Sequence, residues 1–274
     1  MNIKLYSAYE DRFKNHLPKE GEDYIECFDD LYVTKAKVIN PEKTIAIIHE
    51  PRPLQPNVYK YIEKHYKDFK YVFTHDSILL KTLPNAKLVL WCRHWNCSFR
   101  NDEKDFIHPI SMVASYKEQA PVRIQRKQLA FELKGIIDTY GTFDGGKWVR
   151  PEEVYAKYPF SVVIENHIDD WWITEKIVNC FLCNTVPIYW GGKNVDKLFN
   201  SDGIIIVNSP QEIKKVVKYL LTGNNAREEY EKRLDAIKDN RERAKQYSTI
   251  EEWFYRTYGD LLEEMGNGNN NNKQ

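Results

Sequence analysis

The sequence lacks the features that mark membrane and secreted proteins. It has no run of about 18 uninterrupted apolar residues, the length that a membrane-spanning helix needs. Its first residues, MNIKLYSAYEDRF, contain neither the apolar core nor the cleavage site of a signal peptide. We therefore expect no membrane-spanning segment and a cytoplasmic location.

Net charge and disulfide patterns are also missing. The 40 Lys and Arg residues balance the 40 Asp and Glu residues, so no global field draws the chain to nucleic acid or to a membrane surface. The five cysteines show no disulfide spacing, which favours a reducing compartment. Cys180 and Cys183 lie in an apolar helical run without a second pair or nearby histidines, and this context favours buried thiols over a zinc or redox site.

Two glycine motifs are absent. No G-x-G-x-x-G follows a predicted strand, and no G-x-x-x-x-G-K-[ST] occurs anywhere. Gly191-Gly192-Lys193 follows a strand but does not begin a P-loop. These absences exclude the dinucleotide-binding and P-loop nucleotidase families.

Apolar strands alternate with amphipathic helices in two successive series. The first series has strands at 1–7, 43–49, 71–75 and 86–91, with helices at 56–66 and 77–83. The second has strands at 110–115, 160–166, 186–191 and 203–207, with helices at 121–135, 151–158 and 172–184. Further helices are expected at 209–221, 225–246 and 249–264.

This alternation is typical of parallel sheets covered by helices. The two series predict an α/β protein with two Rossmann-like lobes facing a central cleft, the architecture of two-domain nucleotide-sugar transferases. We expect one lobe at 1–108 and the second at 109–265, with 92–110 as the connection between them. The low-complexity tail 266–274 is expected to be disordered.

A polar cluster interrupts the apolar pattern of the second lobe. Glu165 and Asn166 end a buried strand, and polar residues gather at the start of the next, mostly apolar helix: Asp169, Asp170, Thr174, Glu175 and Lys176. Open α/β sheets bind ligands at the carboxyl ends of their strands. A helix N-terminus with a lysine suits an anionic diphosphate, and a nearby carboxylate suits sugar or ribose hydroxyls.

Two further expectations concern the same segment. One of Asp169 and Asp170 is expected to cap the helix, since aspartate is a favoured N-cap residue. Trp171 and Trp172 are adjacent, so both cannot face inward from a helix, and one is expected to stack on a base or a sugar.

The stretch IENHIDDWWITEK, followed by NTVPIYWGG, resembles the donor-site motif of the α-1,3-fucosyltransferases, glycosyltransferase family 10. That motif reads roughly F-E-N-x-x-x-x-x-Y-[IV]-T-E-K, then T-[IV]-P-[IV], with the same separation between its asparagine and second glutamate. The resemblance implies a GT-B fold and places Asn166, Trp172, Thr174 and Lys176 in the donor site. Trp172 stands where the family has tyrosine.

Two more segments are similar to the family pattern. The family places an arginine at the start of the helix before a D-x-Y-G strand, and here PVRIQRKQLAFELKGIIDTYG offers Arg123 or Arg126, with a slight preference for Arg123. The segment AIIHEPRPLQPN is similar to the family's E-[SA]-P stretch, whose glutamate is the proposed base, and puts Glu50 at a strand end.

The resemblance implies an inverting single displacement without a metal or another cofactor. Glu50 would take the proton of the attacking acceptor hydroxyl. Arg123 or Arg126, Lys176 and the helix N-terminus would stabilise the departing diphosphate, and Glu175 would balance charge on the sugar. The implied donor is the nucleotide sugar GDP-fucose, and the implied acceptor is a glycan.

Two alternatives remain open from the sequence. The first transfers another nucleotide sugar to modified bases of viral DNA; the balanced charge of residues 1–110 counts against it, whereas the run from Cys92 to Arg100 favours it. The second is a non-catalytic module that binds a sugar nucleotide or a glycan, although such a module has no use for a base. Trp95 and Trp148 are either sugar platforms or core residues.

Overall fold

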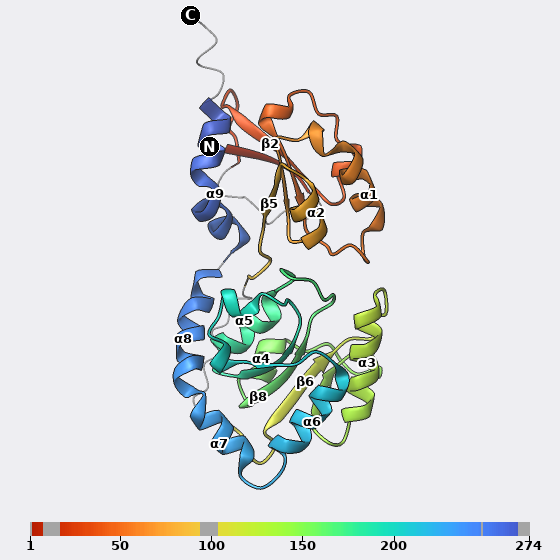
Figure 1. Cartoon of the computed structure of the whole chain (residues 1–274), viewed down its shortest axis with the longest axis vertical. Helices are drawn as coiled ribbons and strands as arrows, with labels where there is room; N and C mark the ends of the chain where they lie inside the picture. The colour runs from red at the N-terminus through yellow and green to blue at the C-terminus, as the bar shows by residue number, and fades with distance from the viewer. Residues whose placement is uncertain (1, 8–16, 94–103, 248, 268–274) are drawn as a thin grey trace, which may run out of the picture. The chain divides into compact units, whose positions relative to one another are not determined.

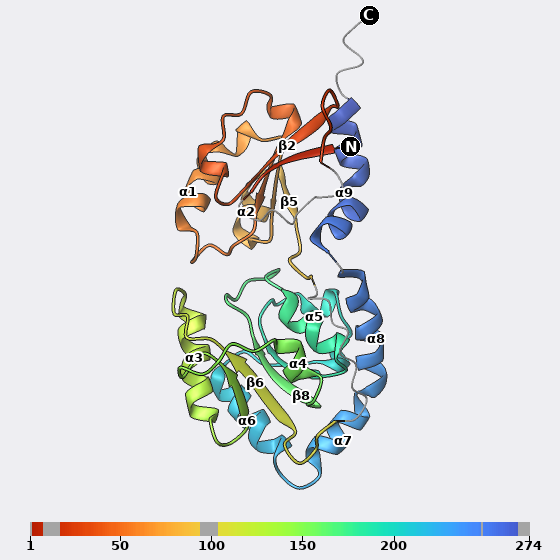
Figure 2. The same ribbon diagram turned by 180° about the vertical axis from the view of Figure 1, so that it is seen from behind.

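The structure is a computed structural model that describes residues 2–7, 17–93, 104–247 and 249–267. The chain divides into two units, each built on one parallel sheet (Figures 1 and 2). The first unit contains the chain up to Trp91 together with the segment from Thr249 onward, and the second contains Cys92–Ser248.

The sheet of the first unit has five parallel strands in chain order: β1 (Asn2–Tyr6), β2 (Tyr24–Asp29), β3 (Thr44–Ile48), β4 (Tyr71–Thr74) and β5 (Ala86–Leu88). All five residues of β3 are buried, as expected for a strand with both faces covered. Ala46 and Ile48 pack into the core cluster beneath α1 (Pro56–His65) and α2 (Ser77–Thr82). Strand β2 was not expected, because Glu26 and Asp29 interrupt its apolar pattern.

The last helix of the chain, α9 (Ile250–Asn267), belongs to the first unit. The ring centroid of Phe254 lies 4.7 Å from that of Phe73, and the ring of Tyr258 lies 4.9 Å from the same Phe73 ring. The Tyr258 hydroxyl also donates a hydrogen bond of 2.6 Å to the carbonyl of Leu88. The helix therefore covers part of this sheet, and Figure 1 shows it on the side of the sheet away from α1.

These units differ from the expected division into 1–108, 109–265 and 266–274. The first unit ends at Trp91, and it includes a helix that was expected in the second lobe. The first two residues of the expected tail form the end of α9, and the others lie outside the described residues. The placement of α9 follows from aromatic contacts between residues far apart in the chain, and no local pattern reports such contacts.

The sheet of the second unit is also parallel, in the order β10-β9-β8-β6-β7. Its strands are β6 (Ile110–Ala114), β7 (Asp138–Gly141), β8 (Phe160–Ile164), β9 (Val186–Trp190) and β10 (Ile205–Ile206). Its helices are α3 (Pro121–Leu133), α4 (Pro151–Tyr155), α5 (Glu175–Leu182), α6 (Pro210–Leu220), α7 (Asn225–Lys232) and α8 (Leu234–Ala244). Figure 1 shows α3 and α6 on one side of the sheet and α5 and α8 on the other.

Strand order places a ligand-binding crevice at β6. The chain leaves β6 through α3 to its neighbour β7, then returns through α4 to β8 on the other side of β6. Such a reversal of direction leaves an open crevice at the carboxyl ends of the strands, which is where open α/β sheets bind ligands. Strand β8 is completely buried, so its end at Ile164 delivers the next residues to this crevice.

Gly141 shapes the same edge of the sheet. It ends β7 beside Ala114, with a φ of 102°, and a Cβ atom added to it would lie 2.2 Å from the carbonyl oxygen of Ala114. Both the backbone conformation and the lack of space therefore require glycine. This close approach holds the ends of β6 and β7 together.

The described cysteines are all buried: Cys27, Cys92, Cys180 and Cys183. The expectation of buried thiols at Cys180 and Cys183 is confirmed, whereas Cys97 lies outside the described residues. Burial, with a contribution from the charge of Glu165, raises the pKa of Cys92 well above its usual value. Its protonated thiol donates to the carbonyl of Ile173 at 3.3 Å.

None of the helices in the described parts of the chain combines the length and the apolar character that crossing a membrane requires.

We predict that Gly141→Ala lowers the free energy of unfolding by about 3 kcal/mol or more, because the new methyl group meets backbone and the residue must keep a positive φ. Gly145→Ala is the matched control. Gly145 has a φ of 87°, but nothing lies within 4 Å of an added Cβ, so we expect a loss of only about 1–2 kcal/mol. Urea unfolding followed by circular dichroism measures both, and equal losses would contradict the steric argument.

Candidate functional site

A pocket that is open to solvent lies at the carboxyl ends of β6, β7 and β8. The start of α5 forms part of its wall. Its polar, charged and aromatic lining includes Ser115, Arg126, Thr142, Trp148, Glu175 and Lys176. The pocket therefore occupies the crevice that the strand order predicts.

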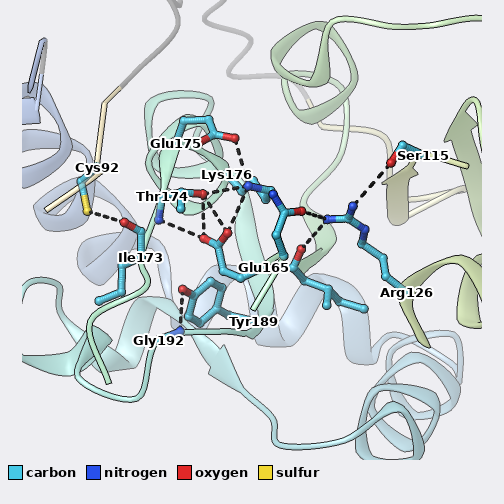
Figure 3. Close-up of polar contacts among 12 residues, drawn as sticks. Cys92, Ser115, Arg126, Glu165, Ile173, Thr174, Glu175, Lys176, Tyr189 and Gly192 are labelled. Carbon is cyan, nitrogen blue, oxygen red and sulfur yellow. Dashed lines mark hydrogen bonds and ion pairs between the residues drawn. The ribbon is translucent and has the colours of Figure 1, made fainter. Parts of the chain in front are cut away.

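Glu165, the first residue after β8, lies at the centre of the site and is completely buried. One of its carboxylate oxygens accepts the backbone N–H of Thr174 at 2.9 Å, and the other accepts the Thr174 hydroxyl at 2.7 Å (Figure 3). Thr174 is the N-cap residue of α5. The glutamate therefore ties the start of the helix to the end of the strand.

Lys176 completes this contact from the first turn of α5. Its ammonium lies 2.8 Å from the Thr174 hydroxyl, 3.0 Å from a carboxylate oxygen of Glu175 and 3.1 Å from one of Glu165. Burial alone would lower the pKa of Lys176, but the two carboxylates outweigh it and raise that pKa. Likewise burial would raise the pKa of Glu175, and the Lys176 ammonium brings it below its usual value. Both side chains are therefore charged at neutral pH.

Arg126, on α3, brings a second cation to the pocket. One guanidinium nitrogen donates to the carbonyl of Ile164 at 3.1 Å and to the side-chain oxygen of Asn166 at 2.9 Å, and the other lies 3.5 Å from the Ser115 hydroxyl (Figure 3). Burial, aided by the charge of Arg123, lowers the pKa of Arg126. Within the described chain its buried Nε has no hydrogen-bond partner.

The structure favours Arg126 over Arg123 as the arginine of this site. Arg123 lies one turn earlier on α3 and donates to Gln119 at 2.9 Å, and it does not line the pocket. Three helical residues advance the chain by about 4.5 Å, so the two arginine side chains leave the helix at different points along its axis. The packing of α3 on β6 decides which of them reaches the crevice, and the sequence alone favoured Arg123 slightly.

The two adjacent indoles differ in burial. Trp172 is 3% exposed and does not line the pocket, so its assignment to donor binding stays a prediction. Trp171 is partly exposed, and the ammonium of Lys197 lies 5.2 Å from its ring centroid. Trp148 is 68% exposed and lines the pocket, which excludes the core interpretation left open from the sequence.

The expectation that Asp169 or Asp170 caps the helix is wrong. Helix α5 begins at Glu175, several residues later, and Thr174 is its N-cap. The carbonyls of the two aspartates instead accept the backbone N–H groups of Lys193 and Asn194, at 3.2 and 2.9 Å. The loop at 167–173 thus separates the strand from the helix. Residue preferences alone do not predict the length of such a loop, and therefore do not predict where the helix begins.

Sequence reasoning missed Tyr189 and the reason for the glycine pair after it. The Tyr189 hydroxyl accepts the N–H of Gly192 at 3.0 Å, and a Cβ on Gly191 would lie 2.3 Å from the tyrosine ring and 2.6 Å from Cγ of Glu165. Burial, with the charge of Glu165, raises the pKa of Tyr189. The two glycines after a buried strand were the available signal, since glycine there permits close approach.

Glu50, the base implied by the family resemblance, lies in the first unit. It follows β3 and is partly exposed. Its backbone N–H donates to Asp30 at 2.7 Å, and its carbonyl accepts the hydroxyl of Tyr59 at 2.8 Å. Most of the run from Cys92 to Arg100, which favoured a DNA substrate, lies outside the described residues, and so does Trp95.

Comparison with known proteins gives a family match for the region that contains the pocket. The family described as "Glycosyltransferase family 10 (fucosyltransferase) C-term" matches residues 107–272. The alpha-(1,3)-fucosyltransferase FucT of Helicobacter pylori is 32% identical over an alignment of 144 residues, and the match covers 47% of this chain. The matched region spans only 28% of the length of that relative.

Solved structures confirm the fold class. An α1,3-fucosyltransferase crystallised with GDP matches 82% of this chain and 72% of its own chain, at 19% identity and a TM-score of 0.50. TarM matches 87% of this chain and 54% of its own, at 11% identity and a TM-score of 0.57. Both are GT-B glycosyltransferases, so the predicted α/β fold of the GT-B class is confirmed.

We predict that Glu165→Gln lowers the free energy of unfolding by about 2–4 kcal/mol, because it leaves the buried Lys176 ammonium facing an amide and removes an acceptor from Thr174. Glu175→Gln removes the other carboxylate charge beside the Lys176 ammonium, but from a more exposed side chain. We therefore expect it to lower the free energy of unfolding by less than about 1 kcal/mol. Urea denaturation at pH 7 measures both losses. A larger loss of stability in Glu175→Gln than in Glu165→Gln would contradict the argument that the burial of Glu165 sets the size of the loss.

Proposed function

This chain belongs to glycosyltransferase family 10, as the sequence motif indicated, and from that premise we propose that it transfers fucose from GDP-fucose to a hydroxyl group of a glycan. The pocket that presents Arg126 and Lys176 at the ends of β6 and β8 is the observation that carries the proposal. The name of the H. pylori relative supports fucose as the sugar, and the GDP bound to the solved α1,3-fucosyltransferase supports the nucleotide.

The two cations suit the diphosphate of the donor. Arg126 and Lys176 both line the pocket, and Thr174, Glu165 and Glu175 fix the Lys176 ammonium there. Negative charge grows on the diphosphate as the bond to the sugar breaks. Cations fixed in a partly buried site stabilise that charge more than they would in water, because little solvent has to reorganise.

Asn166 and Glu175 supply polar groups of complementary kinds. The Asn166 side-chain oxygen accepts from Arg126, and we assign its NH₂ group as a donor to the nucleotide sugar. The Glu175 carboxylate, kept ionised by Lys176, accepts ribose or sugar hydroxyls and opposes the positive charge that develops on the sugar ring. Thr174, 2% exposed, acts by positioning Glu165 and Lys176.

The proposed reaction is a single displacement that inverts the anomeric carbon. Glu50 accepts the proton of the acceptor hydroxyl, the oxygen of that hydroxyl bonds to the anomeric carbon, and the bond from this carbon to the phosphate oxygen breaks. GDP leaves with the electron pair of the broken bond. In this assignment the first unit serves the acceptor and the second binds the donor.

We predict that GDP raises the melting temperature of the protein, because a ligand that binds only the folded state stabilises it. Arg126→Ala and Lys176→Ala should each weaken GDP binding by about 10- to 100-fold, the loss expected for a charge-assisted hydrogen bond. Arg123→Ala is the matched control from the same helix and should change the affinity less than about threefold. Titration calorimetry gives the dissociation constants.

The same protein preparation tests the catalytic assignment. Release of GDP from GDP-fucose, accelerated by one member of a panel of oligosaccharides, is expected from a transferase. Binding of GDP-fucose without turnover on any acceptor would favour the non-catalytic module. Stabilisation by a uridine or cytidine nucleotide sugar in place of GDP would contradict the proposed donor.

We predict that Trp148 stacks on the nucleotide base, since it presents an exposed indole at the pocket wall. GDP should then quench tryptophan fluorescence in the native protein but not in Trp148→Phe, and Trp148→Ala should weaken GDP binding about fivefold or more. Trp171→Phe is the control, because that indole is also partly exposed but does not line the pocket. Quenching that survives in Trp148→Phe would refute the stacking.

A further inference from the structure

Asp30 is a buried carboxylate that none of the roles above uses. It follows the last residue of β2 and is 2% exposed. A carboxylate without solvent is costly unless hydrogen bonds compensate for the lost water. Burial raises the pKa of Asp30 to about 7, even though two backbone hydrogen bonds act in the opposite direction. The fold therefore holds Asp30 at a position where burial disfavours its ionised form.

Both oxygens of Asp30 hold the backbone next to the candidate base. One oxygen accepts the N–H of His49 and the other accepts the N–H of Glu50, each at 2.7 Å. These two residues come directly after β3, the neighbour of β2 in the sheet. A single side chain thus accepts hydrogen bonds from two consecutive backbone N–H groups. These groups lie beyond the end of the strand, where the hydrogen-bond ladder of the sheet no longer supplies acceptors.

The other backbone polar group of Glu50, its carbonyl, is also fixed. The hydroxyl of Tyr59, a fully buried residue of α1, donates to the carbonyl of Glu50 at 2.8 Å. The guanidinium of Arg52 lies 4.5 Å from the Tyr59 ring centroid and makes two hydrogen bonds to Asp76, at 3.0 and 3.1 Å. Glu50 is therefore held at its N–H and at its carbonyl.

We propose that Asp30 is a positioning residue for Glu50, and that its carboxylate fixes the backbone from which the base reaches the acceptor hydroxyl. This role rests on the proposed function, in which Glu50 takes the proton. A base that must meet a hydroxyl at hydrogen-bond distance works best when its backbone has one conformation, since a small displacement lengthens the proton transfer.

The chemistry of the contact explains why a carboxylate is needed. When it is ionised, the Asp30 carboxylate offers acceptors on both oxygens, whereas the amide of asparagine offers one acceptor and one NH₂ group. In Asp30→Asn, one of the two N–H groups would therefore face another donor. Asp29, the last residue of β2, provides a matched control, because it is as buried as Asp30 but accepts the N–H of Leu31 and the hydroxyl of Ser7.

Amide hydrogen exchange tests the contact without any activity assay. Asp30→Asn should speed exchange at His49 and Glu50 at least tenfold, and Asp29→Asn should change it less than about twofold. Unchanged exchange at both amides in Asp30→Asn would overturn the proposal. If that variant does not fold, Asp30→Glu serves in its place, because the added methylene displaces both acceptors while it keeps the charge.

A double-mutant cycle tests the role in turnover, measured as GDP release from GDP-fucose with water and with the best oligosaccharide of the panel. Asp30→Asn should lower kcat at least tenfold and leave the Kd of GDP unchanged. In the Glu50→Gln background it should have no further effect, because its partner in the mechanism is already lost. An equal loss of kcat in both backgrounds would show a general structural role and overturn the proposal.

The same cycle separates this inference from the proposed function. Native turnover in Glu50→Gln would overturn the assignment of the base, and the positioning role of Asp30 would fall with it. If Glu50→Gln abolishes turnover but Asp30→Asn keeps the native kcat, the base assignment stands and the role of Asp30 alone is refuted.

Discussion

The candidate site depends on one buried contact, between the Glu165 carboxylate at the end of β8 and the start of α5. The carboxylate accepts both the N–H and the hydroxyl of Thr174, and it lies 3.1 Å from the Lys176 ammonium. Such a pair is stable only when every polar atom has a partner, since removal of one partner leaves a buried charge. The contact therefore fixes Lys176 at the pocket wall and keeps Glu175 ionised beside it.

Both units use the carboxyl edge of a parallel sheet in the same physical way. Where a strand stops, its backbone N–H and carbonyl groups lose their ladder partners, and a buried side chain from a neighbouring segment replaces them. Arg126 does so for the carbonyl of Ile164, and Asp30 does so for the N–H groups of His49 and Glu50. Each of these residues thereby fixes a strand end that carries a candidate functional side chain.

Much of the fold could be predicted because its strands and helices have clear local patterns. The fully buried strands β3, β8 and β9 read as continuous apolar runs, and Pro residues begin α1, α3, α4 and α6. Strand β2 was not predicted, because Glu26 and Asp29 interrupt its apolar pattern, although Asp29 is buried. The placement of α9 depends on Phe254 meeting Phe73, a contact that no local pattern reports.

The sequence by itself determined the family and the polar cluster from Glu165 to Lys176, because these depend on residue types at fixed spacings along one segment, and the resemblance to that family implied the GT-B class. Only the tertiary structure decided that Arg126 rather than Arg123 lines the pocket, that Trp172 is buried while Trp148 is exposed, and that Asp30 holds the backbone of Glu50. Those outcomes depend on how separate elements pack, and packing brings together residues whose separation in the chain carries no information about their distance in space.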